Sequence, residues 1–338
     1  MSRTLRLVAF LVGAVVLALL IREVGVDTLA DGARTVGWFA VPIVALHAFV
    51  YGLNAFAWYI TLAHEPGAPP FRSIFRISVV GFAINFLTPV VNAGGEPYRM
   101  AALAPWLGAR RAAGSVLQYA MLHALSSLFM WLTAIVAALT LPGVHGRIWW
   151  ALLAMGGVIV AALGVVRSGH RHGFVARLAG WIARRRLGRL SAWLTKQEEA
   201  LVAVDAQITS LHAEQPGRLG AAIAVDYLSR WVAMGELLLV AYAVGTPLGI
   251  TPAVMISGLS ALAVNLFFLL PWEMGSREGS LYLLFGLAGV PASLGLIAAV
   301  MTRLREIVWC ALGLALAGPG GRAAAAEARA GHATPPAA

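Results

Sequence analysis

Two segments of this sequence place charged side chains beside helix-breaking residues in otherwise apolar surroundings. They are NFLTPVVNAGGEPYR at residues 85–99 and NLFFLLPWEMGSRE at residues 265–278. Each opens with Asn, continues through apolar residues to Pro, and then reaches Gly and Glu. Pro and Gly interrupt a helix, which leaves backbone N–H and C=O groups without helical partners. A carboxylate at such a break could hold a proton or a cation, and a helix that begins there offers its N–H groups to an anion.

The residues that could do this chemistry occupy corresponding places in the two segments. The Asn residues are 180 positions apart, at 85 and 265, and the Glu residues are 182 apart, at 96 and 278. Farther along, MLH at residues 121–123 corresponds to MTR at residues 301–303, again 180 positions apart. Three matches at nearly one offset predict an internal duplication. The candidate substrate or translocation residues are Asn85, Pro89, Gly94, Gly95, Glu96, Arg99, His123, Asn265, Pro271, Gly275, Arg277, Glu278 and Arg303.

The composition indicates that these segments lie in a lipid bilayer. Of 338 residues, 60% are hydrophobic and 12% are charged, and the mean hydropathy is +0.80. Soluble domains are about half apolar and a quarter charged. Apolar runs near the ~20 residues that span a bilayer recur along the chain, which predicts an all-α polytopic membrane protein. The predicted helices are Leu7–Ile21, Trp38–Ala63, Ser115–Leu141, Trp149–Val166, Leu219–Gly245, Thr251–Leu270 and Ser293–Ala317.

The arginines predict how the chain is oriented. The net charge is +10, and Lys196 is the one lysine among 25 basic residues. Because basic residues concentrate in cytoplasmic loops, we expect both termini in the cytoplasm and little role for nucleic acid. Residues 167–218 are basic and amphipathic. They either lie against anionic lipid headgroups or form a plain cytoplasmic helical hairpin.

This orientation predicts a single transmembrane domain over residues 1–317. Repeat one covers about 38–166 and repeat two about 219–317, with the amphipathic segment 167–218 between them. The predicted crossings give the two repeats opposite directions. An inverted repeat with two broken or re-entrant helical hairpins is typical of secondary transporters. The sequence leaves open whether the hairpins are re-entrant or fully spanning. Residues 318–338, rich in Gly, Ala and Pro, predict a disordered cytoplasmic tail.

Further charged residues lie within the apolar runs. A charge in the membrane is costly unless it is paired or hydrated, and spacings of three or four residues allow pairing on one helix face. These residues could be structural ion pairs, or they could hold a phosphate or relay a proton. Arg99 and Arg277 are the nearest candidate partners of Glu96 and Glu278, whereas His47 is interpreted as an ordinary packing residue. The predicted supporting ion-pair residues are Asp226, Arg230, Glu236 and Glu306, with Arg305 on another face of its helix.

The sequence resembles the lysylphosphatidylglycerol synthase transmembrane-domain family of flippase-like integral membrane proteins. The likeness covers about residues 5–317 and is most specific in NFLTPVVNAGGEPYR, LLPWEMGSREGSLYLLFGL and VMTRLREIVWCALGLAL. It implies an inverted repeat with re-entrant helices. This chain has Leu122–His123 where many members carry a Glu-Arg pair. The residues that match the family's motifs are Pro89, Gly94, Glu96, Arg99, Pro271, Gly275, Glu278 and Arg303.

The resemblance implies a role in moving lipids. In the multiple peptide resistance factor, this domain is linked to moving aminoacylated phosphatidylglycerol between leaflets. We therefore expect a protein of the bacterial cell membrane that translocates a polar or anionic lipid, such as a phospholipid, a hopanoid-type lipid or a lipid-linked intermediate. The alternative is a membrane partner or enzyme subunit in lipid or glycan biosynthesis, without transport activity of its own.

No catalytic pattern accompanies this lipid role. Lys196 follows Thr195 rather than Gly, so the chain has no Walker motif for ATP, and no metal-ligand or hydrolase motif is present. We also expect this chain to lack the soluble aminoacyl-transferase domain of the two-part synthases. We expect no enzyme activity, no metal and no cofactor. The expected partners are the bilayer, its lipid substrate and, through residues 167–218, lipid-biosynthetic enzymes.

Overall fold

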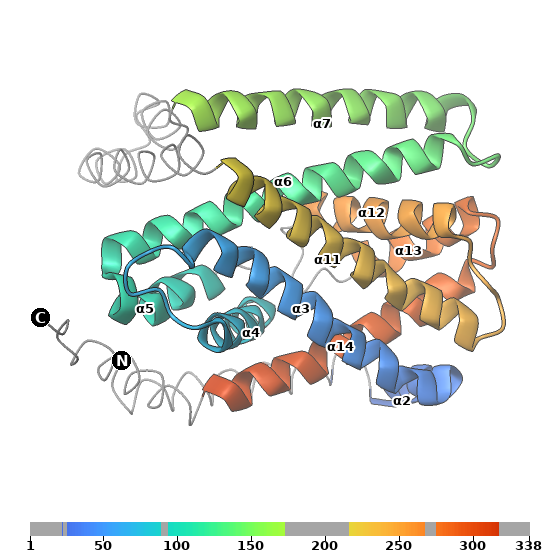
Figure 1. Ribbon diagram of the computed structural model, residues 1–338. Coiled ribbons are helices and arrows are strands. Elements are labelled where there is room, and N and C mark those ends of the chain that lie inside the picture. The colour runs from blue at the N-terminus through green and yellow to red at the C-terminus, as the bar shows by residue number, and fades with distance from the viewer. Residues whose placement is uncertain (1–21, 23–25, 89–93, 173–215, 268–274, 318–338) are drawn as a thin grey trace, which may run out of the picture.

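The computed structural model describes residue 22 and residues 26–88, 94–172, 216–267 and 275–317, and Figure 1 shows how their helices are arranged. Within these residues every regular element is a helix and none is a strand, which confirms the all-α prediction. Several predicted features lie outside the described residues. They are the helix at 7–21, Pro89, Pro271, residues 173–215 of the amphipathic segment, and the tail at 318–338.

The first half of the chain begins with a short helix and a single 3-10 turn, then continues through five longer helices. Their bounds are α2 Val26–Val36, η1 Gly37–Phe39, α3 Ala40–Leu62, α4 Phe71–Leu87, α5 Gly95–Leu107, α6 Ala109–Leu139 and α7 Gly146–His172. The second half contributes α11 Pro216–Ala243, α12 Ile250–Leu266, α13 Ser276–Leu287 and α14 Ser293–Ala317.

The predicted helices recur in the structure with small shifts at their ends. α14 has the predicted bounds, and α3 and α11 differ from theirs by one to three residues. Two helices are longer than predicted. α6 begins at Ala109, six residues before the predicted start at Ser115, because the alanine-rich sequence there favours helix. α7 continues to His172, six residues beyond the predicted end at Val166.

The helix boundaries repeat along the chain with nearly the offset that the motifs have. α4 begins at residue 71 and α12 at 250, which are 179 apart, and each has 17 residues. α5 begins at 95 and α13 at 276, which are 181 apart. α6 ends at 139 and α14 at 317, which are 178 apart. The same order of elements therefore occurs in both halves, as an internal duplication requires.

Helices of each half pack against helices of the other half. α12 packs along α6, and α4 packs along α14, while the first helices of the halves, α3 and α11, pack together. Small residues bring these pairs close. A Cβ on Gly258 of α12 would lie 2.3 Å from the Cβ of Ala134 on α6, and one on Gly313 of α14 would lie 2.8 Å from the Val79 carbonyl oxygen of α4. Such close approaches are typical of helix pairs in membranes.

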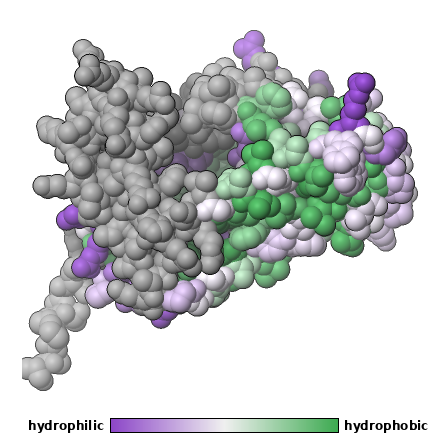
Figure 2. Space-filling view, turned by 90° about the horizontal axis from the view of Figure 1, so that it is seen from above, coloured by the Kyte–Doolittle hydropathy of each residue, from purple (hydrophilic) through white to green (hydrophobic). Residues whose placement is uncertain are grey.

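Helix length and surface composition agree with a membrane environment. Within the described ranges, three helical stretches are long and apolar enough to cross a bilayer: Arg34–Leu62, Ala109–Leu139 and Gly146–Gly164. α11 and α14 are also long, at 28 and 25 residues, but each carries several charged side chains. On α7, Trp150, Val158 and Val160 are exposed. Figure 2, which looks down on the molecule from above the view of Figure 1, shows hydrophobic side chains over much of the described surface.

We predict that the two glycine contacts are sensitive to one added methyl group. Gly258→Ala and Gly313→Ala should each lower the free energy of unfolding by about 1–3 kcal/mol, because the new Cβ overlaps atoms of the neighbouring helix. The measurement is the thermal unfolding midpoint in detergent. Gly157→Ala on α7 is the control, since its Cβ would meet no atom within 4 Å. Equal midpoints for all three variants would show that these helix pairs are less closely packed than described.

Candidate functional site

The first helix break brings the end of α4 against the start of α5. Thr88, which precedes Pro89, is extended at φ −87° and ψ 107°, as a residue before proline prefers, and α4 ends there. α5 begins at Gly95, whose backbone N–H donates to the Asn85 side-chain oxygen at 2.6 Å. A Cβ on Gly95 would lie 2.3 Å from the Gly81 carbonyl oxygen, so this approach requires glycine. The predicted break therefore folds back tightly on α4.

Glu96 lies at this break with the partner that the sequence predicted. Arg99 Nη1 is 2.9 Å from Glu96 Oε1, and the Asn85 amide donates to the same oxygen at 3.3 Å. The Arg99 side chain crosses α4 at Gly81, where a Cβ would lie 2.6 Å from its Nε. Glu96 keeps 35% of its side chain exposed, whereas Arg99 keeps 13%. The carboxylate is thus the more accessible member of the pair.

The second break also holds a glutamate paired with an arginine, but here the arginine comes from another helix. Gly275 has φ +78°, and its N–H donates to Glu278 Oε2 at 2.8 Å. The other oxygen, Oε1, accepts from Arg303 Nη2 at 3.2 Å. Glu278 is again 35% exposed, while the Arg303 side chain is 4% exposed. Arg303 of α14, rather than the sequence neighbour Arg277, is therefore the partner that the structure gives to Glu278.

Asn265 differs from its counterpart in the first half. Its side-chain amide donates to the Ala261 carbonyl oxygen of its own helix at 2.8 Å, and the residue is exposed. Asn85, in contrast, joins the start of α5 to Glu96. The two copies therefore match in their Gly and Glu residues but not in their Asn residues.

Glu306 on α14 gathers three arginines around one carboxylate. Arg277 Nη1 lies 3.0 Å from its Oε1, Arg303 Nη1 lies 3.6 Å from its Oε2, and Arg305 Nη2 lies 3.8 Å from its Oε1. The predicted Arg303–Glu306 pair is present. Sequence spacing did not associate Arg277 or Arg305 with this acid, because Arg277 comes from α13 and Arg305 was placed on another face of α14.

Glu236 on α11 extends this group into the protein. Arg305 Nε lies 3.1 Å from its Oε2, and the Thr302 hydroxyl donates to Oε1 at 2.8 Å. His47 of α3, interpreted from sequence as a packing residue, has Nε2 at 3.6 Å from Oε2. We call the charged set the second-half cluster. It comprises Glu236, Arg277, Glu278, Arg303, Arg305 and Glu306.

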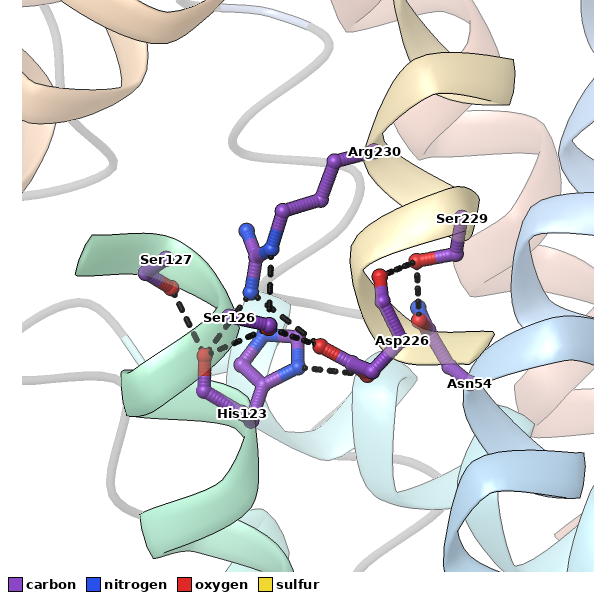
Figure 3. Close-up of polar contacts among 7 residues, drawn as sticks. All are labelled: Asn54, His123, Ser126, Ser127, Asp226, Ser229 and Arg230. Carbon is purple, nitrogen blue, oxygen red and sulfur yellow. Dashed lines mark hydrogen bonds and ion pairs between the residues drawn. The ribbon is translucent and has the colours of Figure 1, made fainter. Parts of the chain in front are cut away.

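Asp226 is the centre of a second group, between α6 and α11 (Figure 3). Its side chain is fully buried and lies 3.1 Å from His123 Nδ1, while the Ser126 hydroxyl donates to its other oxygen. Arg230 Nη2 is 3.4 Å from Asp226 Oδ2, which confirms the predicted pair. Arg230 also donates to the Ser126 hydroxyl at 3.0 Å and to the His123 carbonyl at 2.9 Å. Three side chains from two helices thus share one buried carboxylate.

Tyr119 connects this group to the first helix break. Its ring centroid lies 5.9 Å from that of His123, and Arg99 Cζ is also 5.9 Å from the Tyr119 centroid. Trp58 of α3 stacks on the Tyr119 ring, with ring centroids 5.2 Å apart. The Glu96–Arg99 pair and the Asp226 group are therefore neighbours across one aromatic ring. We call their charged and titratable residues the first-half cluster, and they are Glu96, Arg99, His123, Asp226 and Arg230.

The two clusters balance their charge. The first-half cluster has two carboxylates, two guanidinium groups and His123, and the second-half cluster has three of each charged group. Buried charges persist when partners and hydrogen bonds offset the cost of removing them from water. The N–H groups of Gly95 and Gly275 are also bonded, to Asn85 and Glu278. Within the described residues, no group of three or more His, Cys, Asp or Glu side chains is arranged to hold a metal ion.

Comparison with known proteins agrees with this architecture. The sequence matches the family described as "Lysylphosphatidylglycerol synthase TM region" over residues 6–313. The chain belongs to this family. It is also 26% identical over 312 residues to a UPF0104 membrane protein of Methanothermobacter thermautotrophicus, which covers 88% of this chain and 90% of that protein. No solved structure matches. The family match includes both helix breaks and both clusters, so these charges belong to a membrane protein.

We predict that removing the Asp226 carboxylate is strongly destabilising. Asp226→Ala should lower the free energy of unfolding by about 3–5 kcal/mol, because it leaves Arg230 without its carboxylate in a low-dielectric site. Adding Arg230→Met to the same chain should recover part of this loss. The measurement is thermal unfolding in detergent.

The control for this pair is the exposed pair formed by Asp31 and Arg34, whose side chains are 72% and 78% exposed. Asp31→Ala should have little effect, since exposed ion pairs contribute little. If Asp226→Ala proved as mild as Asp31→Ala, the central role of Asp226 in the cluster would be wrong.

Proposed function

We propose that this protein translocates a polar or anionic lipid between the leaflets of the cell membrane. The observation that carries the proposal is the pair of carboxylates at the two helix breaks. Glu96 and Glu278 are each 35% exposed, and each is paired with a more deeply buried arginine. Ionisable residues at helix breaks within a membrane protein usually mark a substrate or ion pathway.

The proposed architecture is an inverted repeat with two re-entrant hairpins. α5 and α13 have 13 and 12 residues, or about 20 Å of helix at ~1.5 Å per residue, which is less than the ~30 Å bilayer core. Each hairpin then enters and leaves on one side, and both termini lie in the cytoplasm. The reciprocal packing of α4 on α14 and α12 on α6 supports such a relation between the halves.

A groove on the interface of α6 and α11 supports a lipid as the substrate. It has a volume of about 360 Å³ and is lined by residues that include Phe129, Leu132, Ile223 and Tyr227. The same two helices hold the Asp226 group. A lipid could therefore keep an acyl chain against apolar side chains while its headgroup meets the polar cluster. Backbone freed by the helix breaks is tolerable in a membrane only beside protein or a wet cavity, and a hydrated headgroup path meets that condition.

The charged groups then have distinct roles in the proposed cycle. Glu96 and Glu278 meet hydroxyl or cationic parts of the headgroup, since they are more accessible than their arginine partners. Arg99 and Arg303 meet the phosphate once the carboxylates turn toward the headgroup. The chain shows no nucleotide-binding motif, so movement follows the lipid gradient or an ion gradient.

Removing both carboxylates should slow lipid movement. Glu96→Gln combined with Glu278→Gln should reduce translocation of a fluorescent phospholipid at least about tenfold, because hydrogen bonds to charged groups contribute ~1.5–3 kcal/mol. The measurement is the rate at which the probe changes leaflet in proteoliposomes. Glu65→Gln is the control, since Glu65 lies outside both clusters beside His64.

Two outcomes would contradict the proposal. An unchanged rate in the double variant would show that the breaks are not on the lipid path. A wild-type protein that moves no lipid would instead favour a membrane partner of lipid-biosynthetic enzymes.

A further inference from the structure

Each arginine of the two clusters has its own carboxylate. Five arginines and five carboxylates can be matched one to one, each at 3.4 Å or less. The matched pairs are Arg99–Glu96, Arg230–Asp226, Arg277–Glu306, Arg303–Glu278 and Arg305–Glu236. The Gly95 and Gly275 N–H groups, at the starts of α5 and α13, donate to Asn85 and Glu278. Among the described side chains of these clusters, an anionic headgroup therefore meets no arginine without a carboxylate partner.

Two histidines contact carboxylates of the clusters, and His123 is the more exposed of the two, since the His47 side chain is 5% exposed. The His123 side chain is 45% exposed, although its partner Asp226 is fully buried. Nδ1 faces Asp226 Oδ1 at 3.1 Å, and this contact occupies one ring nitrogen. Histidine changes charge within the range from about pH 5 to about pH 8. One proton taken up by the imidazole adds one positive charge to a cluster that is otherwise neutral.

We propose that the anionic headgroup of the lipid binds together with one proton, which His123 takes up. The inference rests on the proposed function and names its coupling ion. The proton comes from water that reaches the exposed part of the His123 side chain, and it forms an N–H bond on the ring. The imidazolium keeps its contact with Asp226 and presents a positive charge to the phosphate. When the lipid leaves, the proton returns to water, so each anion crosses with its own compensating charge.

Among the described residues around His123, the other charged groups are already paired with one another. From α11, Asp226 faces His123 and is already matched by Arg230. From its own helix, Tyr119 contacts the ring, and across Tyr119 lie Glu96 and Arg99 of α5, which match each other. α12 contains no ionisable side chain. Residues 146–164 of α7 carry one charged residue, Arg147, near the end joined to α6, and α3 contributes the uncharged Trp58 and Asn54.

The same geometry favours a proton over a metal cation. The oxygen atoms that could bind a small cation are Asp226 Oδ2, Ser126 Oγ and the His123 carbonyl. The Arg230 guanidinium already contacts all three, at 3.4, 3.0 and 2.9 Å (Figure 3). A permanently charged side chain thus occupies the position that sodium would need. The imidazole ring remains as the site where a coupling ion can bind.

The repeat offers a natural test substitution. His123 stands 180 residues before Arg303, so an arginine occupies the corresponding place in the second half. His123→Arg should carry a fixed charge at this place, whereas His123→Gln can never become charged. His64→Gln is the matched control, because His64 lies outside both clusters beside Glu65.

The primary experiment counts protons on lipid binding. Phosphatidylglycerol is titrated into the purified protein by calorimetry, in buffers that release different heats when they lose a proton. The wild type and His64→Gln should take up one proton per bound lipid at alkaline pH. Affinity should fall up to about tenfold per pH unit there, as linkage requires. His123→Arg should bind tightly with no proton uptake at any pH, and His123→Gln should bind weakly throughout.

A second arm separates this inference from the proposed function. A fluorescent phosphatidylglycerol and a zwitterionic phosphatidylcholine are followed in proteoliposomes from about pH 5.5 to about pH 8.5. The wild-type rate for phosphatidylglycerol should fall with rising pH, and His123→Arg should remove that dependence. Unchanged pH dependence in His123→Gln, or proton uptake in His123→Arg, would overturn the role of His123 while leaving translocation intact. Proton-linked binding without movement of either probe would overturn translocation alone.

Discussion

The matching of buried arginines with buried carboxylates is the constraint on which the rest of this structure depends. Burying a single charge inside a membrane protein costs free energy. In a low-dielectric interior, the free energy lost by leaving a charge unpaired is larger than the free energy gained by an ion pair. α11 carries the buried acids Asp226 and Glu236, and α14 carries three buried charges within residues 303–306. The packing of α3, α6 and α13 around them follows from where these pairs must form.

The accessible carboxylates of these ion pairs lie at the two helix breaks. Thr88 stops α4 because proline follows it, and Gly95 lets α5 start against the α4 backbone. This fold-back places Glu96 beside Arg99 and Asn85. In the second half, Gly275 adopts a positive φ that a side chain would disfavour, and Glu278 closes the start of α13. At both breaks, therefore, the carboxylate is partly exposed and its arginine partner is more deeply buried.

The two halves use one framework for different chemistry. In the second half, Arg303 and Glu306 of α14 pair with Glu278 and Arg277 of α13, so these ion pairs join the two helices. At the corresponding positions of α6, 180 residues earlier, stand His123 and Ser126, which bind one carboxylate of α11. The first half thus has an imidazole where the second half has a guanidinium, which carries a fixed charge. In the proposed cycle, His123 responds to protons and Arg303 keeps its charge.

The sequence alone determined the class of the protein, the helix breaks and the acids at them. Apolar runs, prolines and glycines determine helix bounds through local interactions, so both ends of α14 could be predicted to the residue. The pairs Glu96–Arg99 and Asp226–Arg230 could be predicted because their members are three or four residues apart. Tertiary structure decided the pairs between helices. Arg303 rather than Arg277 meets Glu278, and His47 and Arg305 meet Glu236. Spacing along one helix carries no information about a partner on another helix, since that partner depends on how the two helices cross.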